Sequence, residues 1–444
     1  MPATGAPSIA RRPPEIRPAE SAWLTQLPAR SILTISRFRN LARRFAAIYL
    51  AAAILGLNAV LMFAGLELAS MAALKTRLWL IAREPGLVGE GAARERVSYY
   101  KTQDWGQLYW HEFLLSRKQR YYPYVAWRRA PFAGKTINID EHGIRQTPGA
   151  DCRSDAYKVF AFGGSTMWGT GAPDWGTIAA RLQARLEERR PEPVCVTNFG
   201  ETGYVSTQSL VMLLLQLKLG NVPNAVVFYD GPNDVYAAYQ AGRVGVHENF
   251  YQIAALFEAP LKGELKGESF RELLQNSYSY AVVDALVGKF TSGKEQPQVT
   301  VMNYESIGVD AAALSEMVVQ NYLSNYTMVD VLARRFGFEA FMFIQPILSM
   351  GNKPLTQEEQ QMKWTYESDR ALAKLDAAVY RAFDLESSRH ERLTYLANIF
   401  DENPASLWID DSHVNPLGND VIAETMVDAI MAKRPARRTA RSFR

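Results

Sequence analysis

From residue 157 onward, short apolar runs alternate with longer segments whose apolar residues recur every three or four positions. The short runs predict β-strands, and the longer segments predict helices with one apolar face. The expected strands are residues 157–162, 194–199, 225–229, 340–344 and 395–400, and the expected helices are 177–188, 208–219 and a long stretch through Ala333. Strands that alternate with helices form a parallel sheet covered on both faces. The pattern therefore predicts an α/β fold with a central parallel sheet.

A different apolar pattern lies near the N-terminus. Residues 45–66 form a run of 22 residues without a formal charge, in which Asn58 is the only strongly polar side chain. This length is sufficient for one transmembrane helix. A buried core helix is the alternative, but such a helix usually keeps a polar face. A cleaved signal peptide fits poorly, because the run begins late and ends at Glu67 without a small-x-small cleavage site.

The charges that flank this run predict its orientation. Lys75 and Arg77 are the nearest cations after it, whereas five arginines lie just before it: Arg30, Arg37, Arg39, Arg43 and Arg44. Cytoplasmic flanks carry the excess of Lys and Arg. We therefore expect a protein that spans the membrane once, with a cytoplasmic N-terminus and the chain after residue 66 outside. In a bacterium this membrane is the inner membrane, and the outer side is the periplasm.

Composition shifts along the chain predict its domain boundaries. The expected regions are a basic cytoplasmic tail (1–44), a transmembrane helix (45–66), an aromatic-rich juxtamembrane region (67–150), the main α/β domain (151–432) with an insertion at about 235–310, and a basic tail (433–444). The region after residue 66 reads as a helical connector up to about residue 98. The tyrosines and tryptophans after it form either a carbohydrate-binding face or a small β-rich cap packed on the main domain. The insertion either walls the site beside Asn233 or packs away from it.

Overall composition narrows the class of function. The 444 residues are 48% hydrophobic and 21% charged, which suits a sizeable core. A net charge of +3 is too small to indicate nucleic-acid binding. Five histidines and two cysteines without a Cys-x-x-Cys motif give little support for a metal site, so no metal or cofactor is expected. Cys152 and Cys195 either form a disulfide, as the periplasm allows, or remain two thiols.

Four polar and glycine-rich segments follow the apolar runs in a fixed order. They are Gly163-Gly164-Ser165-Thr166, Asn-Phe-Gly-Glu-Thr-Gly at 198–203, Gly231-Pro232-Asn233-Asp234 and Asp410-Asp411-Ser412-His413. The first three come at the carboxyl ends of the first three expected strands, where sites form in open α/β sheets. A serine on a glycine turn and a C-terminal Asp-x-x-His are parts that serine acyl-transfer chemistry needs. The segments therefore predict one active site.

The residues of these segments have expected catalytic roles. Ser165 is the expected nucleophile, and His413 is the expected base that takes its proton. Asp410 is expected to accept a hydrogen bond from the other ring nitrogen, since at a spacing of three the two side chains share one side of a helical turn. Structural alternatives remain: the glycine turn could cap the following helix, and Asp410 and Asp411 could cap the helix that starts near Pro416.

Over roughly residues 155–430, the four segments resemble the blocks of the SGNH (GDSL-like) hydrolase family. That family's first block usually reads Gly-Asp-Ser, whereas Gly164 stands here in place of the aspartate, a form that looks like that of a membrane-anchored bacterial branch. An Asn…Gly-x-Arg element at 138–145 is also similar to one in such relatives, although no role for it follows from the sequence.

The resemblance implies both a fold and an oxyanion hole. The fold is a flavodoxin-like three-layer α/β/α sandwich. The oxyanion hole consists of the backbone N–H groups of Ser165 and Gly203 and the side-chain amide of Asn233.

Together these features predict a membrane-anchored serine esterase that removes acyl groups, O-acetyl being the expected one, from a cell-envelope or exported polysaccharide. The expected partners are an acylated glycan or another small acyl ester and the inner membrane, and no nucleic acid. One alternative is an O-acyltransferase, in which a sugar hydroxyl replaces water at the same site. The other is a non-catalytic glycan-binding or assembly scaffold.

Overall fold

The computed structural model describes residues 29–83, 94–258 and 303–432. Residues 1–28 of the predicted N-terminal tail, the C-terminal tail at 433–444 and the polar break at 291–297 lie outside the described residues. Residues 29–44, which we expected to belong to the N-terminal tail, are helical. The chain divides into two units, of which the first contains the N-terminal residues up to Lys75 and the second contains the sheet and the predicted site. The predicted domain boundaries stay predictions.

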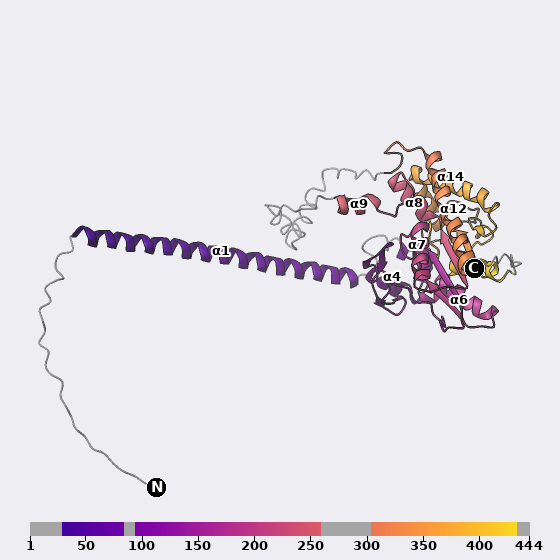
Figure 1. Cartoon of the computed structure of the whole chain (residues 1–444), viewed down its shortest axis with the longest axis horizontal. Helices are drawn as coiled ribbons and strands as arrows, with labels where there is room; N and C mark the ends of the chain where they lie inside the picture. The colour runs from indigo at the N-terminus through magenta and orange to yellow at the C-terminus, as the bar shows by residue number, and fades with distance from the viewer. Residues whose placement is uncertain (1–28, 84–93, 259–302, 433–444) are drawn as a thin grey trace, which may run out of the picture. The chain divides into compact units, whose positions relative to one another are not determined.

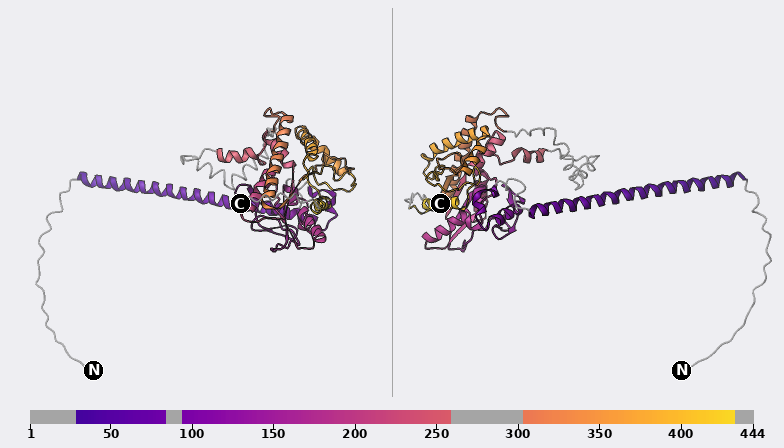
Figure 2. Two further views of the ribbon diagram at one scale, coloured as in Figure 1. Left: turned by 45° about the vertical axis from the view of Figure 1, so that its right-hand side comes forward. Right: turned by 180° about the vertical axis from the view of Figure 1, so that it is seen from behind.

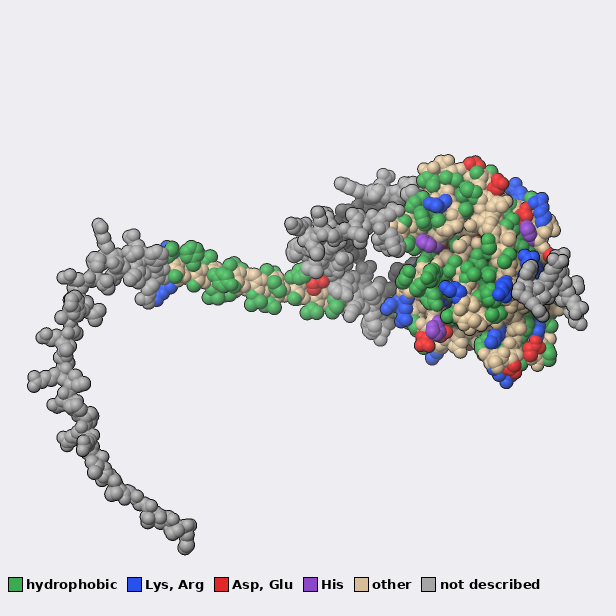
Figure 3. All heavy atoms as spheres, in the orientation of Figure 1, with side chains coloured by type: hydrophobic (Ala, Val, Ile, Leu, Met, Phe, Trp, Pro, Cys, Tyr) green, Lys and Arg blue, Asp and Glu red, His purple; other side chains and the backbone are tan. Residues whose placement is uncertain are grey.

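The first unit is dominated by one long helix. Helix α1 runs from Ala29 to Arg83, and its segment Asn40–Ala72 is the one stretch of the described residues that is long and apolar enough to cross a membrane. In the most apolar window of this segment no side chain is packed in a core, as the exposed Phe45, Ile48 and Tyr49 illustrate. Hydrophobic side chains cover its visible side (Figure 3). The predicted span at 45–66 lies inside it.

The second unit is built around a five-stranded sheet. Its strands are β5 (Tyr157–Gly163), β6 (Val194–Asn198), β7 (Ala225–Asp230), β8 (Glu339–Ile344) and β9 (Leu393–Tyr395). They lie in the order β6-β5-β7-β8-β9, and every neighbouring pair is parallel. In chain order this is 2-1-3-4-5, the flavodoxin-like arrangement. The predicted parallel α/β fold is confirmed.

The fifth strand differs from its predicted position. We expected it at 395–400, whereas β9 ends at Tyr395. Leu396 and Phe400 are buried, but the chain between them turns, with Ile399 N–H donating to the Leu396 carbonyl and Asp401 N–H to the Asn398 carbonyl. A turn that is buried between packed elements is as apolar as a strand, so apolar composition alone does not distinguish a turn from a strand.

Helices cover both faces of the sheet. Strand residues point alternately to each face: Val159 and Ala161 pack with one helical layer, and Phe160 and Phe162 pack with the other. Helices α12 and α14 lie side by side in all views (Figures 1 and 2). The first layer contains α6 (Ile178–Arg189) and α15 (Pro416–Met431), and the second contains α7 (Ser206–Lys218), α8 (Pro232–Ala241), α12 (Ala311–Phe336) and α14 (Arg370–Ser387).

Polar side chains fix where several of these helices begin. The Thr177 hydroxyl accepts a hydrogen bond from Ala180 N–H at the start of α6, and the Asp310 carboxylate accepts one from Ala313 N–H at the start of α12. Asn415 caps α15. The alternative in which Asp410 and Asp411 cap that helix is therefore wrong.

Residues 94–150 form what we term the N-terminal cap. It contains α3 (Ser98–Lys101), α4 (Gly106–Leu115), the hairpin of β1 (Gln119–Tyr122) and β2 (Ala126–Arg129), and the short pair β3 (Phe132–Ala133) and β4 (Asn138–Ile139). Helices and strands contribute about equally to it, with 10 residues in α4 and 4 each in α3, β1 and β2, so the cap is mixed instead of β-rich.

The aromatic side chains of the N-terminal cap divide into two groups. The rings of Tyr100, Tyr109 and Trp110 are buried in one cluster with Trp168 of the main domain. Packing therefore accounts for these rings. Tyr121, by contrast, is 78% exposed.

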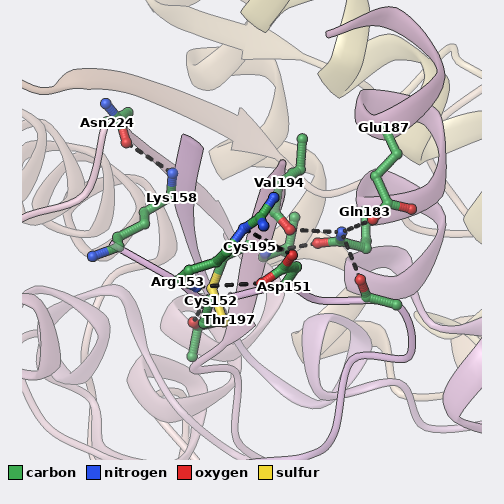
Figure 4. Close-up of a disulfide and its surroundings, with 12 residues drawn as sticks. Asp151, Cys152, Arg153, Lys158, Gln183, Glu187, Val194, Cys195, Thr197 and Asn224 are labelled. Carbon is green, nitrogen blue, oxygen red and sulfur yellow. Dashed lines mark hydrogen bonds and ion pairs between the residues drawn. A yellow bond between two sulfur atoms is a disulfide. The ribbon is translucent and has the colours of Figure 1, made fainter. Parts of the chain in front are cut away.

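Cys152 and Cys195 form a disulfide (Figure 4). It ties the segment before β5 to β6, the strand that leads into the second motif segment. Gln183 of α6 holds the same region, because its side-chain amide donates to the Val194 carbonyl and accepts from Val196 N–H. Of the two alternatives for the cysteines, the structure contains the disulfide. The described residues also form α5 (Ser165–Trp168), α9 (Phe250–Glu258), α13 (Gln357–Glu367) and the 3-10 turn Asp174–Gly176.

Candidate active site

Three motif segments meet at one edge of the sheet. Ser165 begins the short helix α5 (Ser165–Trp168) directly after β5, Gly203 follows β6, and Asn233 lies in the first turn of α8 after β7. Because β6, β5 and β7 are adjacent and parallel, their carboxyl ends lie together. Segments far apart in the sequence are thereby brought to the same place.

The fourth segment completes a hydrogen-bonded relay at this edge. The Ser165 hydroxyl lies 2.7 Å from His413 Nε2. His413 Nδ1 lies 2.9 Å from Asp410 Oδ2 and 3.0 Å from Oδ1. His413 is only 7% exposed, so little water competes for these bonds. In this arrangement the imidazole can take a proton from the serine while the carboxylate stabilises the resulting imidazolium.

Asp410 and His413 do not lie on a helical turn, as their spacing led us to expect. They lie in a bend closed by the bridge between Trp408 and Val414. Asp410 Oδ1 accepts from the backbone N–H groups of Ser412, at 2.9 Å, and His413, at 2.7 Å. These bonds fold the carboxylate back over its own loop and toward the imidazole. The predicted contact is present, but a bend produces it.

Gln345 links the two halves of the relay and was missed in the sequence. It directly follows β8, and its side chain is buried. Its side-chain oxygen accepts from the Thr166 hydroxyl at 2.6 Å, and its side-chain nitrogen donates to the Ser412 carbonyl at 2.8 Å. Thr166 and Ser412 are the chain neighbours of Ser165 and His413. A polar residue at the carboxyl end of a buried strand is the signal that could have identified it.

The predicted oxyanion donors are close to the serine. Gly203 has φ +76°, a conformation that favours glycine. Within the described residues, the backbone N–H groups of Ser165 and Gly203 donate to no other backbone carbonyl. Asn233 Nδ2 donates to the Tyr204 carbonyl at 2.7 Å, which orients the amide and leaves its second N–H for another acceptor.

The close approach of Asn233 explains the glycine at position 164. A Cβ atom added to Gly164 would lie 2.2 Å from Asn233 Nδ2. Any side chain there would push the amide away from its bond to the Tyr204 carbonyl. The departure from the usual Gly-Asp-Ser block therefore fits the local packing of this chain.

Arg94 contacts the relay from the N-terminal cap. Its Nε donates to Asp410 Oδ2 at 2.5 Å, across 316 positions of sequence. Burial alone would raise the pKa of Asp410, but the positive charges of Arg94 and His413 outweigh it and hold that pKa well below its usual value. Asp410 therefore stays ionised. No local pattern at Arg94 indicates this contact.

Arg145 gives the Asn…Gly-x-Arg element a structural role. It is fully buried, and its guanidinium donates to the carbonyls of Trp168, Gly169 and Ala172. It also forms an ion pair with Asp174, with 2.9 Å between Nε and Oδ1. These carbonyls lie at and after the end of α5, where the helix leaves acceptors unpaired. Arg145 thus fixes the segment that follows the serine.

One cavity contains the groups at this edge. Its volume is about 680 Å³, and Ser165, Gly203, Asn233 and His413 line it. Residues of the predicted insertion line it as well: Glu248, Asn249 and Ile253. This lining favours the interpretation of the insertion as a wall of the site. Within the described residues, no group of three or more His, Cys, Asp or Glu side chains could hold a metal ion.

Comparisons with known proteins give only distant similarities. No family model and no curated protein matches the chain. Among solved structures it is similar to the lipase Lip_vut3 from a goat rumen metagenome, with 14% identity over 62% of this chain and 97% of that one and a TM-score of 0.34.

Two further solved structures are similar at the same level. A member of the lipolytic G-D-S-L family from Veillonella parvula has 10% identity over 63% of this chain and 99% of that one, with a TM-score of 0.32. A catalytic mutant of Axe2, an acetylxylan esterase from Geobacillus stearothermophilus, has 13% identity over 65% and 98%, with a TM-score of 0.34. The fold assignment rests on strand order and not on these values.

Proposed function

We propose that this protein is a membrane-anchored serine ester hydrolase of the SGNH type. The observation that carries the proposal is the relay in which His413 lies 2.7 Å from the Ser165 hydroxyl and 2.9 Å from the Asp410 carboxylate. A serine bonded to an oriented histidine is the arrangement that makes a hydroxyl nucleophilic at neutral pH. Asp410 holds the imidazole with Nδ1 protonated, so that Nε2 faces the serine as a base.

In the proposed first step, Ser165 Oγ attacks the carbonyl carbon of the ester while His413 Nε2 takes the hydroxyl proton. The carbonyl oxygen becomes an oxyanion, for which the N–H groups of Ser165 and Gly203 and the amide of Asn233 are the proposed donors. The intermediate then collapses, the C–O bond to the alcohol breaks, and His413 returns the proton to the leaving oxygen. The product of this step is an acyl-serine.

In the second step, water attacks the acyl-serine. His413 takes a proton from the water, a second oxyanion forms at the same donors, and Ser165 leaves with the proton returned by His413. The net reaction is hydrolysis of one ester to an acid and an alcohol. Arg94 is proposed as a positioning residue, because it acts on this chemistry only through Asp410.

The proposed location is the periplasmic face of the inner membrane, with α1 as the anchor and the N-terminus in the cytoplasm. The apolar segment of α1 and the five arginines before residue 45 support it. The Cys152–Cys195 disulfide also supports it, since disulfides persist in oxidising compartments. The proposed substrate is an acyl ester, O-acetyl in particular, on a cell-envelope or exported polysaccharide.

The direct test is hydrolysis of an aryl acetate by the full chain in detergent. We expect Ser165→Ala and His413→Ala each to lower kcat/KM by at least about 10⁴-fold, since removing either group disables the relay. Ser324→Ala and His142→Ala serve as controls, because both side chains are exposed and lie outside the cavity. If Ser165→Ala hydrolyses the ester as fast as the controls, the proposal is wrong.

A further inference from the structure

Three arginines of the N-terminal cap line the cavity that contains Ser165. Arg94 belongs to the relay, and the other two are Arg117, which is exposed, and Arg129, whose side chain is 4% exposed. Their charges are close enough that Arg117 helps to lower the pKa of Arg129, to which burial contributes most. Two like charges beside a cavity repel each other unless an anion lies between them or near them. This pair is not needed for the relay.

Arg129 has hydrogen-bonding capacity that the described residues do not use. Its Nη1 donates to the Ser116 hydroxyl at 3.0 Å, whereas its Nε is buried without a hydrogen-bond partner. The nearest carboxylate, Glu201, lies 3.8 Å from Nε. Both Glu201 oxygens already accept other bonds, from the Thr202 N–H and hydroxyl and from the Arg129 backbone N–H. The ion pair with Glu201 is therefore incomplete.

Arg129 packs against elements that also carry the candidate catalytic groups. Its guanidinium lies 3.8 Å from the centre of the Trp168 ring and 5.0 Å from that of Phe113, which fixes its plane. Trp168 ends the helix that Ser165 begins, and Glu201 belongs to the segment that contains Gly203. An anion bound to Arg129 would therefore lie beside an ester held at the serine.

The acidic residues of the cavity come from other parts of the chain. Glu248 belongs to the insertion, Asp376 to α14 and Asp411 to the loop before His413. Burial raises the pKa of Asp376 to about 7, and burial with the charge of Asp410 raises that of Asp411 to about 6. The cavity residues from the cap include arginines and no acid. The cap therefore contributes positive charge to the cavity, whereas the insertion, α14 and the loop before His413 contribute its acidic groups.

We propose that the cavity selects esters whose alcohol part carries an anionic group, a carboxylate or a phosphate, bound by Arg129 and Arg117. This inference rests on the proposed function and names the substrate class of the same site. Guanidinium groups bind carboxylates and phosphates through their N–H donors. Arg129 has such a donor in Nε, which makes no hydrogen bond within the described residues.

The test compares three aryl acetates with the full chain in detergent: para-acetoxybenzoate, para-acetoxyphenyl phosphate and the neutral para-acetoxybenzamide. The measured quantity is kcat/KM for each anionic ester divided by that for the neutral one. Arg117→Ala should lower this ratio about fivefold, the upper range for an exposed ion pair. Arg117→Glu should lower it further, and Arg117→Lys should keep it within about twofold of wild type.

The matched controls are Arg120→Ala and Arg120→Glu. Arg120 lies on the same hairpin and is exposed, but it does not line the cavity. The two control variants should leave the ratio within about twofold of wild type. If Arg120 variants lower the ratio as much as Arg117 variants, the effect is a general surface field and the proposal is overturned. A larger ratio for the phosphate ester than for the carboxylate ester, or the reverse, identifies which anion the site prefers.

A binding measurement separates this proposal from the proposed function. Para-hydroxybenzoate and phenyl phosphate are titrated calorimetrically into full-length Ser165→Ala and into Ser165→Ala/Arg117→Glu. Binding to the first and about tenfold weaker binding to the second supports the anion site, even if no ester is hydrolysed. Equal binding to both, or none to either, overturns it even if wild type is an active esterase.

Discussion

The sheet edge and the N-terminal cap contribute to the same cavity in different ways. The sheet edge supplies Ser165, Gly203 and Asn233, each in the short segment that follows a strand. The cap supplies Arg94 and Arg129, whose long side chains reach the site from residues far away in the sequence. The sheet edge therefore carries the proposed chemistry, whereas the proposed role of the cap is to adjust charge and substrate choice. Substitutions at the edge should cost far more activity than substitutions in the cap.

The largest effect is expected for the loop that completes the sheet-edge relay. Asp410→Asn should lower kcat/KM by about 10⁴-fold, because the amide no longer holds the imidazole in the tautomer that accepts the serine proton. Steady-state hydrolysis of an aryl acetate measures this. Asp401→Asn, at an exposed turn that bonds to Asn352, is the matched control. A loss of less than about tenfold would show that Asp410 does not orient the base.

A smaller effect is expected at the proposed oxyanion donor. Asn233→Ala should lower kcat by about 10²- to 10³-fold with little change in KM, since the amide bonds to charge that develops only in the transition state. Comparison of kcat and KM for wild type and variant checks this. A rise in KM at unchanged kcat would instead assign Asn233 to ground-state binding.

Removing the Arg94 side chain of the cap should lower the rate modestly and should change the pH dependence of that rate. Arg94→Ala should lower kcat/KM by about three- to tenfold, as expected for one partly exposed ion pair. It should also shift the acid limb of the pH profile to higher pH, because Arg94 no longer helps to hold the pKa of Asp410 below its usual value. The other groups that lower the pKa of Asp410 are His413 and the Ser412 N–H.

Two variants sharpen the Arg94 measurement. Arg94→Lys keeps the charge and should keep the wild-type acid limb. Arg96→Ala removes an exposed cation two residues away and should change neither rate nor limb. If Arg94→Ala lowers stability but leaves the limb in place, Arg94 has a structural role only, and the proposed link between cap and relay is wrong.

The last prediction concerns the stability of the fold instead of catalysis. Asp376 is buried, and its pKa in the folded chain is raised to about 7. An acid with a raised pKa stabilises the fold when protonated, and this contribution is lost as pH rises from about 4 through about 7. Asp376→Asn should therefore be more stable than wild type by about 4 kcal/mol at pH 8 and by much less at pH 5. Denaturant unfolding of the full chain in detergent at both pH values checks this; equal differences would refute it.

The elements at the sheet edge were predictable because their signals are local. An apolar run followed by a glycine and a polar residue indicates a buried strand and its carboxyl end, which was sufficient to place the segments of Ser165, Gly203 and Asn233 at strand ends. The choice of Gly203 and Asn233 as oxyanion donors came from the family resemblance and stays a prediction. The fifth strand was misplaced because a buried turn at 396–400 is as apolar as a strand. The contact between Asp410 and His413 was predicted from helical spacing, but backbone donors in a bend produce it.

The residues that sequence reasoning missed share one property. The partner of Arg94 is 316 positions away, and Gln345 lies 179 positions from Thr166. A single arginine or glutamine carries no local pattern that names a partner at such separation. The Asn…Gly-x-Arg element was noticed, but the role of Arg145 became clear only from the carbonyls at the end of α5.

The central claim is that Ser165 is the nucleophile, and covalent labelling tests it most directly. Full-length protein in detergent is treated with a fluorophosphonate, digested and mapped by mass spectrometry. The account predicts one adduct, on Ser165, that is absent from His413→Ala because the hydroxyl is no longer activated. Labelling of another residue, or labelling of Ser165 that persists undiminished in His413→Ala, would contradict it.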